Sequence, residues 1–145
     1  SSSYRLLKDR DILILTELTS EDNNQSISIA KKDAKMTLPI GVLSFDEVSK
    51  IENTHLNIIY VDESKIKFPL AVRKWQEGDY FFPLGMKGKK KLSKYFKDEK
   101  LSLIDKENTW LLCSEEAILW VIGKRADDRF KVTENTKQII KFEII

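Results

Sequence analysis

A run of lysines between residues 87 and 100 is the part of this sequence best suited to binding chemistry. Seven lysines lie in this window against Asp98 and Glu99, which gives it a net charge of +5. Gly85 and Gly88 stand beside the first lysines, and exposed backbone amides together with lysine side chains can hold phosphate groups. A solvated helix face has the same composition. The charge run alone leaves both interpretations open.

A nucleotide-binding loop of the Walker type is excluded at this position. That loop requires the spacing G-x-x-x-x-G-K-[ST] after a strand. Here Gly85 and Gly88 are too close together, and Lys90 follows Gly88–Lys89 where a hydroxyl would be needed for magnesium.

Groups that could support catalysis or hold a metal are few. His55 is the single histidine, and its place just before a strand favours a turn or strand-edge role. Cys113, the single cysteine, alternates with Leu112 in an apolar strand, so we expect it to be buried. Without a cysteine–histidine cluster we expect no zinc site, and we expect no catalytic residue or metal ligand in the chain.

The segment 125–129 places Asp127 and Asp128 between Arg125 and Arg129. Paired carboxylates suit acid–base chemistry or cation binding, and an independent enzyme using the two aspartates stays open as an alternative. We favour a turn in which the arginines pair with the aspartates. Either arginine would still be available to contact phosphate.

Alternation of apolar and polar residues predicts a chain made mainly of strands. Pro39 and Gly41 interrupt one of them, which favours an edge or bent strand. A hairpin turn at 114–116 joins two others. The predicted strands are 11–18, 26–30, 36–45, 56–62, 68–75, 109–113, 117–123 and 137–145.

One clear helix is predicted, over residues 89–98. Leu92, Tyr95 and Phe96 form an apolar stripe, and Lys90, Lys94 and Lys97 form a separate basic stripe. The lysines would then lie at and beside the positive end of the helix. The strand spacing favours a closed or nearly closed antiparallel β structure, so the fold class is β-rich α+β, a barrel-like core with one or two short helices.

Composition limits the classes of protein and partner. A chain of 145 residues, 41% hydrophobic, suits one compact domain or two very small ones. The net charge of +2 divides into −2 for residues 1–70 and +4 for residues 71–145, so one patch, and not the whole chain, indicates a polyanionic partner. The sequence has no apolar run long enough to span a membrane and no signal region at its start, so we expect a cytoplasmic protein without membrane contact.

Three motifs in order carry a resemblance to a known family. They are RKWQEGDYFFPLGMKGKKKLSKYFKDEKLS (73–102), ENTWLLC (107–113) and ILWVIGKRADDRFKVT (118–133). Together they resemble the C-terminal domain of bacterial tRNA(Ile)-lysidine synthetases. The resemblance implies a barrel-like domain shared with the phenylalanyl-tRNA synthetase β subunit. It divides the chain into residues 67–145, the domain itself, and residues 1–66, a β-rich segment that precedes or completes it.

Enzymes of this family use ATP and magnesium to join lysine to the wobble cytidine of an isoleucine tRNA. Their chemistry belongs to an N-terminal domain marked by an SGG-x-DS loop, and no such loop occurs here. The resemblance therefore implies a C-terminal fragment with no cofactor and no catalysis of its own. Its partners would be tRNA(Ile), held toward the acceptor stem, and the N-terminal catalytic domain of the same polypeptide.

The residues that this hypothesis assigns to tRNA are cationic, apart from one glycine in the loop. Leu92 and Phe96 would anchor the helix that carries some of them. The assigned residues are Arg73, Lys74, Lys87, Gly88, Lys89, Lys90, Lys91, Lys94, Lys97, Arg125 and Arg129. The alternative is an interdomain or dimerisation module without RNA contact, which would leave the lysines solvated and allow a homodimer.

Overall fold

The computed structural model describes residues 26–145, and most of its regular structure is antiparallel strand. A five-stranded sheet has the order β1-β5-β8-β9-β10, and a four-stranded sheet has the order β2-β3-β11-β4. The first contains β1 (Ser26–Ile29), β5 (Leu70–Lys74), β8 (Trp110–Ser114), β9 (Ala117–Val121) and β10 (Arg125–Ala126). The second contains β2 (Lys35–Leu38), β3 (Gly41–Val48), β11 (Ile139–Ile144) and β4 (Ile58–Asp62). The predicted strand over 11–18 lies outside the described residues.

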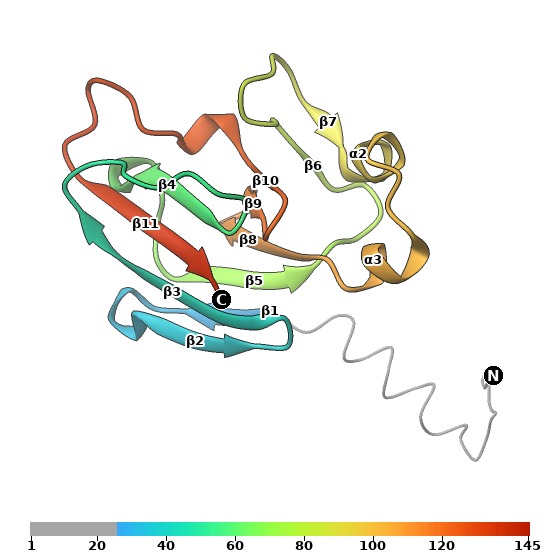
Figure 1. Cartoon of the computed structure of the whole chain (residues 1–145), viewed down its shortest axis with the longest axis horizontal. Helices are drawn as coiled ribbons and strands as arrows, with labels where there is room; N and C mark the ends of the chain where they lie inside the picture. Colours follow the sequence, from blue (N-terminus) through green and yellow to red (C-terminus); the bar gives the residue numbers. More distant parts are fainter. Residues whose placement is uncertain (1–25) are drawn as a thin grey trace.

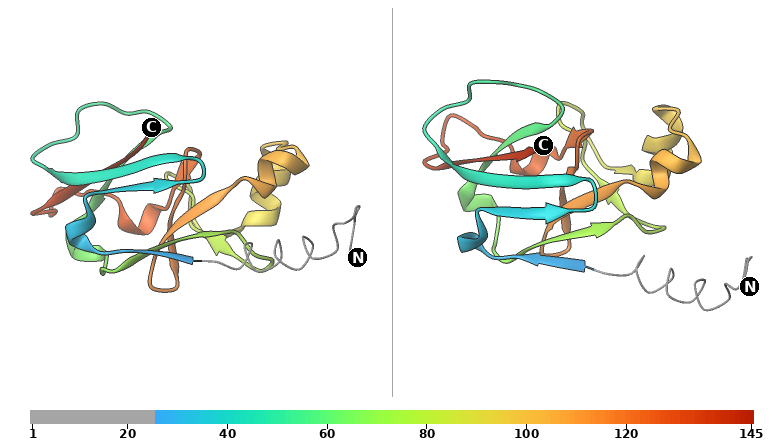
Figure 2. Two further views of the ribbon diagram at one scale, coloured as in Figure 1. Left: turned by 90° about the horizontal axis from the view of Figure 1, so that it is seen from below. Right: turned by 60° about the horizontal axis from the view of Figure 1, so that its bottom comes forward.

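The two sheets pack face to face around the main hydrophobic core (Figures 1 and 2). Alternate residues of each strand point into it, as the pleat requires. Leu43 and Phe142 enter from the four-stranded sheet, and Val72, Leu112 and Trp120 enter from the five-stranded one; all five are fully buried. Strands from residues 26–66 thus contribute to both sheets, beside strands from the rest of the chain.

The β-rich α+β class is confirmed, but the structure is not a closed barrel. Each sheet is open and has two edge strands: β1 and β10 in one, β2 and β4 in the other. Closure would need a continuous ladder around the molecule. At the β4 edge Val61 makes an isolated bridge to Lys131, which lies after β10 and belongs to neither sheet.

Strand β8 is buried on both faces, which explains its unbroken apolar sequence. Leu112 points into the main core, while Leu111 and Cys113 point into a second core cluster on the opposite face of the sheet. The ladder between β8 and β9 shifts register between Leu112 and Cys113. This second core cluster holds the helical part of the chain against the five-stranded sheet.

The segment 36–45 forms a hairpin, where we had predicted one bent or edge strand. β2 is an edge strand, whereas β3 pairs on both sides. Gly41 follows the turn at φ +142°, and a Cβ at this position would collide with the carbonyl oxygen of Ile145. Glycine lets the C-terminal residue close over the hairpin.

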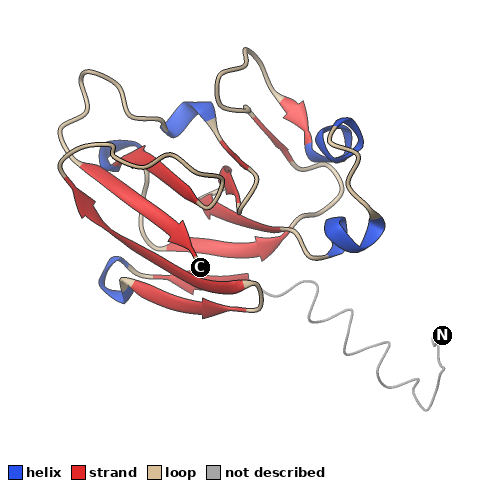
Figure 3. Cartoon of the chain, in the orientation of Figure 1, coloured by secondary structure: helices blue, strands red, loops and turns tan. Residues whose placement is uncertain are grey.

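The predicted helix over 89–98 is shorter than expected. Residues Lys90–Lys91 form β7, which pairs with β6 (Tyr80–Phe81), and helix α2 then runs Leu92–Asp98. The first helical amide, that of Leu92, donates to the carbonyl of Asp79 at 2.9 Å. We therefore assign no phosphate contact to the end of this helix. A second short helix, α3 (Leu103–Glu107), follows it (Figure 3).

The remaining helical turns are short 3₁₀ segments. They are η1 (Lys31–Asp33), η2 (Glu63–Lys65) and η3 (Asp128–Phe130). No helix within residues 26–145 is long and apolar enough to cross a membrane.

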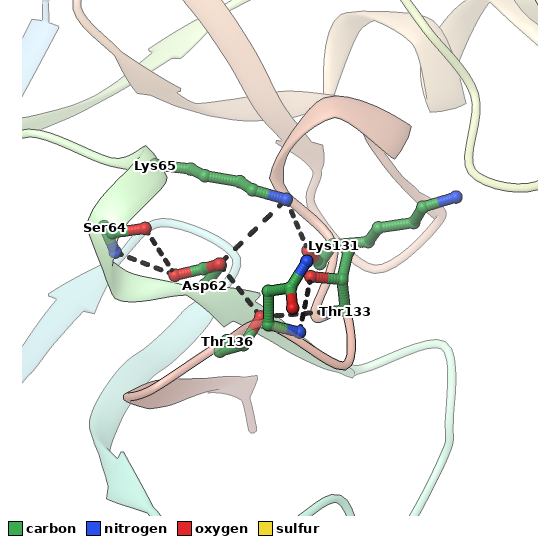
Figure 4. A network of polar contacts seen from close by, with 7 residues as sticks. Asp62, Ser64, Lys65, Lys131, Thr133 and Thr136 are labelled. Carbon is green, nitrogen blue, oxygen red and sulfur yellow. Dashed lines mark hydrogen bonds and ion pairs between the residues drawn. The ribbon is translucent and has the colours of Figure 1, made fainter.

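A buried carboxylate ties the end of β4 to the segment before β11 (Figure 4). Asp62 accepts hydrogen bonds from the amide and hydroxyl of Ser64 and, at 2.9 Å, from the Thr136 hydroxyl. Burial favours the neutral carboxyl, but these hydrogen bonds outweigh it and hold the pKa of Asp62 below its usual value. Lys65 lies 4.0 Å from the same carboxylate.

The main core generates a stability prediction. Phe142 is fully buried, with its ring centroid 5.3 Å from that of Phe45. We expect Phe142→Ala to lower the free energy of unfolding by about 3–5 kcal/mol, because it removes buried surface and leaves a cavity. Urea unfolding measures this, with Leu103→Ala as the control, since Leu103 is 67% exposed. Equal losses in both variants would contradict the assigned core.

Candidate nucleic-acid interface

The lysine run lies on a unit that stands beside the two sheets. β6, β7 and α2 come together at one side of the molecule (Figure 1). Phe81 from β6 and Leu92, Tyr95 and Phe96 from α2 pack into the second core cluster against Val121 and its neighbours. The predicted apolar stripe of the helix is thus confirmed. It places the opposite side of the unit, with its lysines, toward solvent.

Five lysines of the unit are exposed. Three of them lie in the β6–β7 loop and β7, and two lie on α2. They are Lys87, Lys89, Lys91, Lys94 and Lys97. The Nζ of Lys94 lies 3.7 Å from Oδ1 of Asp98, yet the Lys94 side chain is 69% exposed. These cations are close in sequence and are carried by one packed unit, so their fields add.

Lys90 differs from its neighbours. Its Nζ lies 2.6 Å from an oxygen of Asp98, and its side chain is 19% exposed. The hydrogen bond and charge of Lys90 hold the pKa of Asp98 below its usual value. The predicted stripe of Lys90, Lys94 and Lys97 is therefore not a helical stripe, since Lys90 belongs to β7 and connects that strand to the last turn of α2.

The loop between β6 and β7 is fixed to the five-stranded sheet by residues 125–128. The Leu84 amide donates to the carbonyl of Ala126 at 2.9 Å, and the Leu84 carbonyl accepts from Arg125. The Gly85 amide donates to Asp128 at 3.1 Å. Lys87 and Gly88 are thus presented from a loop with a fixed base. Gly88 adopts φ +86° with open space around it, a conformation that glycine adopts without strain.

Asp127 organises this attachment. Its carboxylate is buried and accepts from the amide of Phe82 at 2.9 Å, from the amide of Arg129 at 2.8 Å, and from two guanidinium nitrogens of Arg129. The prediction that an arginine closes this turn is confirmed for Arg129. Asp128 accepts instead from Gly85 and Lys131, whose hydrogen bonds hold the pKa of Asp128 below its usual value.

Two further residues of the predicted site lie on β5. Arg73 makes two hydrogen bonds to Asp79, at 2.9 and 3.0 Å, and is half-buried. We had expected it to extend the phosphate surface, but its guanidinium is used inside the molecule. Lys74 lies with its Nζ 5.7 Å from the centre of the Trp110 ring. The structure does not bring either residue into the group of exposed lysines.

Cys113 and His55, the two side chains considered above for nucleophilic or acid–base chemistry, both have structural roles: one is buried and the other accepts a hydrogen bond in a turn. Burial raises the pKa of Cys113 to about 11, so its thiol is protonated at neutral pH. His55 is exposed, and its Nδ1 accepts from the amide of Asn57 at 3.2 Å in the turn before β4. Within residues 26–145 no group of three or more histidine, cysteine, aspartate or glutamate side chains is placed to hold a metal ion.

Comparison with known proteins decides the family. A family model described as the TilS substrate C-terminal domain matches residues 70–143, which include the anchored loop, β7 and α2. The chain belongs to this family. The resemblance carried by the motifs at 73–133 is confirmed.

Two full-length relatives extend the match across the chain. This chain is 47% identical over 144 residues to a tRNA(Ile)-lysidine synthase of Parabacteroides distasonis, with 97% of this chain and 32% of the relative covered. It is 36% identical over 146 residues to a tRNA(Ile)-lysidine synthase of Bacteroides thetaiotaomicron, with 100% of this chain and 32% of the relative covered. The chain spans about a third of the length of these relatives.

Solved structures agree on the fold of the TilS C-terminal domain. A crystal structure of a TilS C-terminal domain superposes with a TM-score of 0.67 at 22% identity, covering 83% of this chain and 98% of that one. An N-terminal fragment of the phenylalanyl-tRNA synthetase β subunit from Pyrococcus horikoshii superposes with a TM-score of 0.50 at 25% identity, covering 59% of this chain and 27% of that one. The predicted likeness to both folds is confirmed.

Sequence reasoning missed two kinds of residue in this TilS domain. Asp79 and Asp98 are the partners that occupy Arg73 and Lys90. Lys90 and Asp98 are eight residues apart, a spacing typical of no helical pair, because the link runs from a strand to the far end of a helix. The exposed Tyr80 and half-buried Phe82, which lie against the basic groups, were also missed, although their alternation is visible in the sequence.

The buried carboxylate generates a prediction about the loop. We expect Asp127→Asn to speed hydrogen exchange at the Phe82 amide by about ten-fold or more, because the substitution removes the charge and leaves one acceptor oxygen for four donors. Exchange at Ile140 in β11 reports global opening and should change less. Asp46→Asn, at an exposed carboxylate on β3, is the control. Unchanged exchange at Phe82 would show that Asp127 does not hold the loop.

Burial of Cys113 generates a second prediction. We expect the native thiol to resist alkylation by iodoacetamide at mildly alkaline pH and to react readily once the chain is unfolded. The reason is that the raised pKa and the burial both keep the reactive thiolate from forming. Mass spectrometry with and without urea measures it. Rapid modification of the folded chain would refute the structural role.

Proposed function

We propose that this chain is the tRNA-binding C-terminal region of a tRNA(Ile)-lysidine synthase. It holds tRNA(Ile) toward the acceptor stem, while an N-terminal domain of the same polypeptide uses ATP and magnesium to join lysine to the wobble cytidine. The observation that carries this proposal is the group of five exposed lysines on one anchored loop, strand and helix of a TilS substrate domain.

The contacts proposed are with phosphates. Flexible lysines on a fixed base can follow an RNA backbone, and such contacts position the RNA and detect its shape more than its bases. The proposed set is Lys87, Lys89, Lys91, Lys94 and Lys97, with the Gly88 backbone at the point of closest approach. Lys90 is not in this set, because its ion pair with Asp98 connects β7 to the last turn of α2. Arg73 is not in this set either, because its guanidinium is paired with Asp79.

Catalysis is assigned to the other domain in this proposal. The alternative of an enzyme using Asp127 and Asp128 requires a carboxylate that can exchange protons near neutral pH. The buried carboxylate of Asp127 is occupied by Phe82 and Arg129, and hydrogen bonds lower the pKa of Asp128. In both residues the carboxylate oxygens are held by hydrogen bonds within the domain.

An interdomain or dimerisation role has its own supporting observation. Leu103 and Ile104 on α3 are each 67% exposed, beside the lysine-bearing unit. Apolar residues in this position would suit a contact with another domain or a second copy. That role predicts a stable oligomer and tRNA binding that is absent or independent of the lysines. Sedimentation of the chain with and without tRNA distinguishes the two roles.

The proposed function predicts a charge-reversal effect. We expect Lys87→Glu/Lys91→Glu to weaken binding of an isoleucine tRNA transcript by at least about ten-fold at moderate salt, because two phosphate contacts become repulsive. The control is Lys32→Glu/Lys35→Glu, which makes the same change in net charge on η1 and β2 at the opposite end of the molecule (Figure 2). Fluorescence anisotropy over a series of salt concentrations measures both.

The salt dependence tests the same proposal. If about five phosphates are neutralised, affinity should fall with roughly the fourth power of salt concentration. The loop variant should show a shallower slope, and the control should keep the original one. A flat response in the unmodified chain, or equal losses in both variants, would reject tRNA binding through the lysine run.

A further inference from the structure

Residues 80–86, in β6 and the loop after it, include several exposed apolar and aromatic side chains. Tyr80, Leu84 and Met86 are 43%, 40% and 44% exposed, and half-buried Phe82 lies between them in sequence. Every second residue from 80 to 86 is therefore apolar or aromatic and reaches the surface. Contact with phosphates does not require such groups, and exposed apolar groups that gather on a surface are typical of interaction sites.

Two cations lie over the two aromatic rings of this segment, those of Tyr80 and Phe82. The Nζ of Lys89 is 4.7 Å from the centre of the Tyr80 ring, and Cζ of Arg129 is 4.3 Å from the centre of the Phe82 ring. The rings themselves meet edge to face, with centroids 6.1 Å apart. Lys89, Tyr80, Phe82 and Arg129, which we call the aromatic row, thus form a continuous series of contacts with the two rings in the middle and one cation at each end. Flat apolar faces and positive charge occur together there.

The aromatic row is built before any ligand arrives. Asp127 holds the guanidinium of Arg129 with hydrogen bonds at 3.0 and 2.9 Å, and the same carboxylate holds the Phe82 amide. The guanidinium of Arg129 and the backbone that carries the Phe82 ring are therefore held by one group. A fixed planar surface loses little entropy when another planar group stacks on it.

We propose that the aromatic row binds an unpaired RNA base by stacking, beside the phosphates held by the lysines. This rests on the proposed function and deepens it. Bases inside an A-form duplex are stacked on one another, so an aromatic side chain can take a base only from an unpaired nucleotide. The positive charge of Lys89 and of the exposed lysines near it in sequence favours an anionic partner with planar groups, and a single-stranded stretch of RNA next to a duplex has both.

The test compares two RNAs and uses the intact chain. One is a blunt-ended RNA hairpin, and the other is the same hairpin with a short single-stranded tail. Fluorescence anisotropy should show the tailed RNA binding about five-fold or more tighter, the low end of what one stacked base contributes. Tyr80→Ala should abolish that preference and leave affinity for the blunt hairpin unchanged, whereas Tyr80→Phe should keep it. Leu56→Ala, at an exposed apolar residue in the turn before β4, is the matched control.

Each outcome decides between the two proposals. Equal affinity of the unmodified chain for both RNAs, or equal weakening of both by Tyr80→Ala, would overturn the stacking site and leave the lysine contacts intact. Loss of the preference in Tyr80→Phe as well would also overturn it, since the ring is retained. Failure of the unmodified chain to bind either RNA would overturn the proposed function together with the stacking site.

Discussion

The carboxylate of Asp127 is the interaction on which the proposed binding surface depends. It is buried and joins two parts of the chain 45 residues apart, through the amide of Phe82, while also fixing Arg129. A buried charge is tolerated when hydrogen bonds and an opposite charge compensate for lost hydration, and here both are present. Asp128 and Arg125 extend the attachment to Gly85 and Leu84. The loop therefore leaves the sheet at a fixed point.

The second core cluster fixes the other end of the same unit. Phe81 and Phe96 are fully buried against the face of the five-stranded sheet opposite the main core. Because β8 supplies Leu112 to the main core and Leu111 to the second core cluster, both faces of the five-stranded sheet are packed. The lysines are consequently carried by packed elements, and a partner that binds them does not have to order a free segment.

The sequence predicted what depends on local pattern and missed what depends on distant contacts. Alternation located β1, β4, β5, the β8–β9 hairpin and β11, and the i, i+3, i+4 spacing of Leu92, Tyr95 and Phe96 identified the buried face of α2. The start of that helix was wrong because pairing of β7 with β6 overrides helical preference at Lys90. Whether sheets close into a barrel depends on edge pairing, which periodicity does not report. The pairing of Arg73 with Asp79 was missed because it links a strand residue to the end of the turn 76–79, a relation that strand alternation does not report.

The acidic partners divide the cations of the unit into two kinds. Arg73, Lys90 and Arg129 are held by Asp79, Asp98 and Asp127, so they contribute geometry and little net field. Lys87 and Lys91 are exposed in the loop and in β7, and they contribute field. Lys87, Lys91 and Arg129 suit these roles: a flexible ammonium can follow a backbone whose position varies, whereas a planar guanidinium held in place suits stacking. A surface that combined exposed lysines with a fixed stacking group would bind a duplex through its phosphates and recognise the place where the duplex ends.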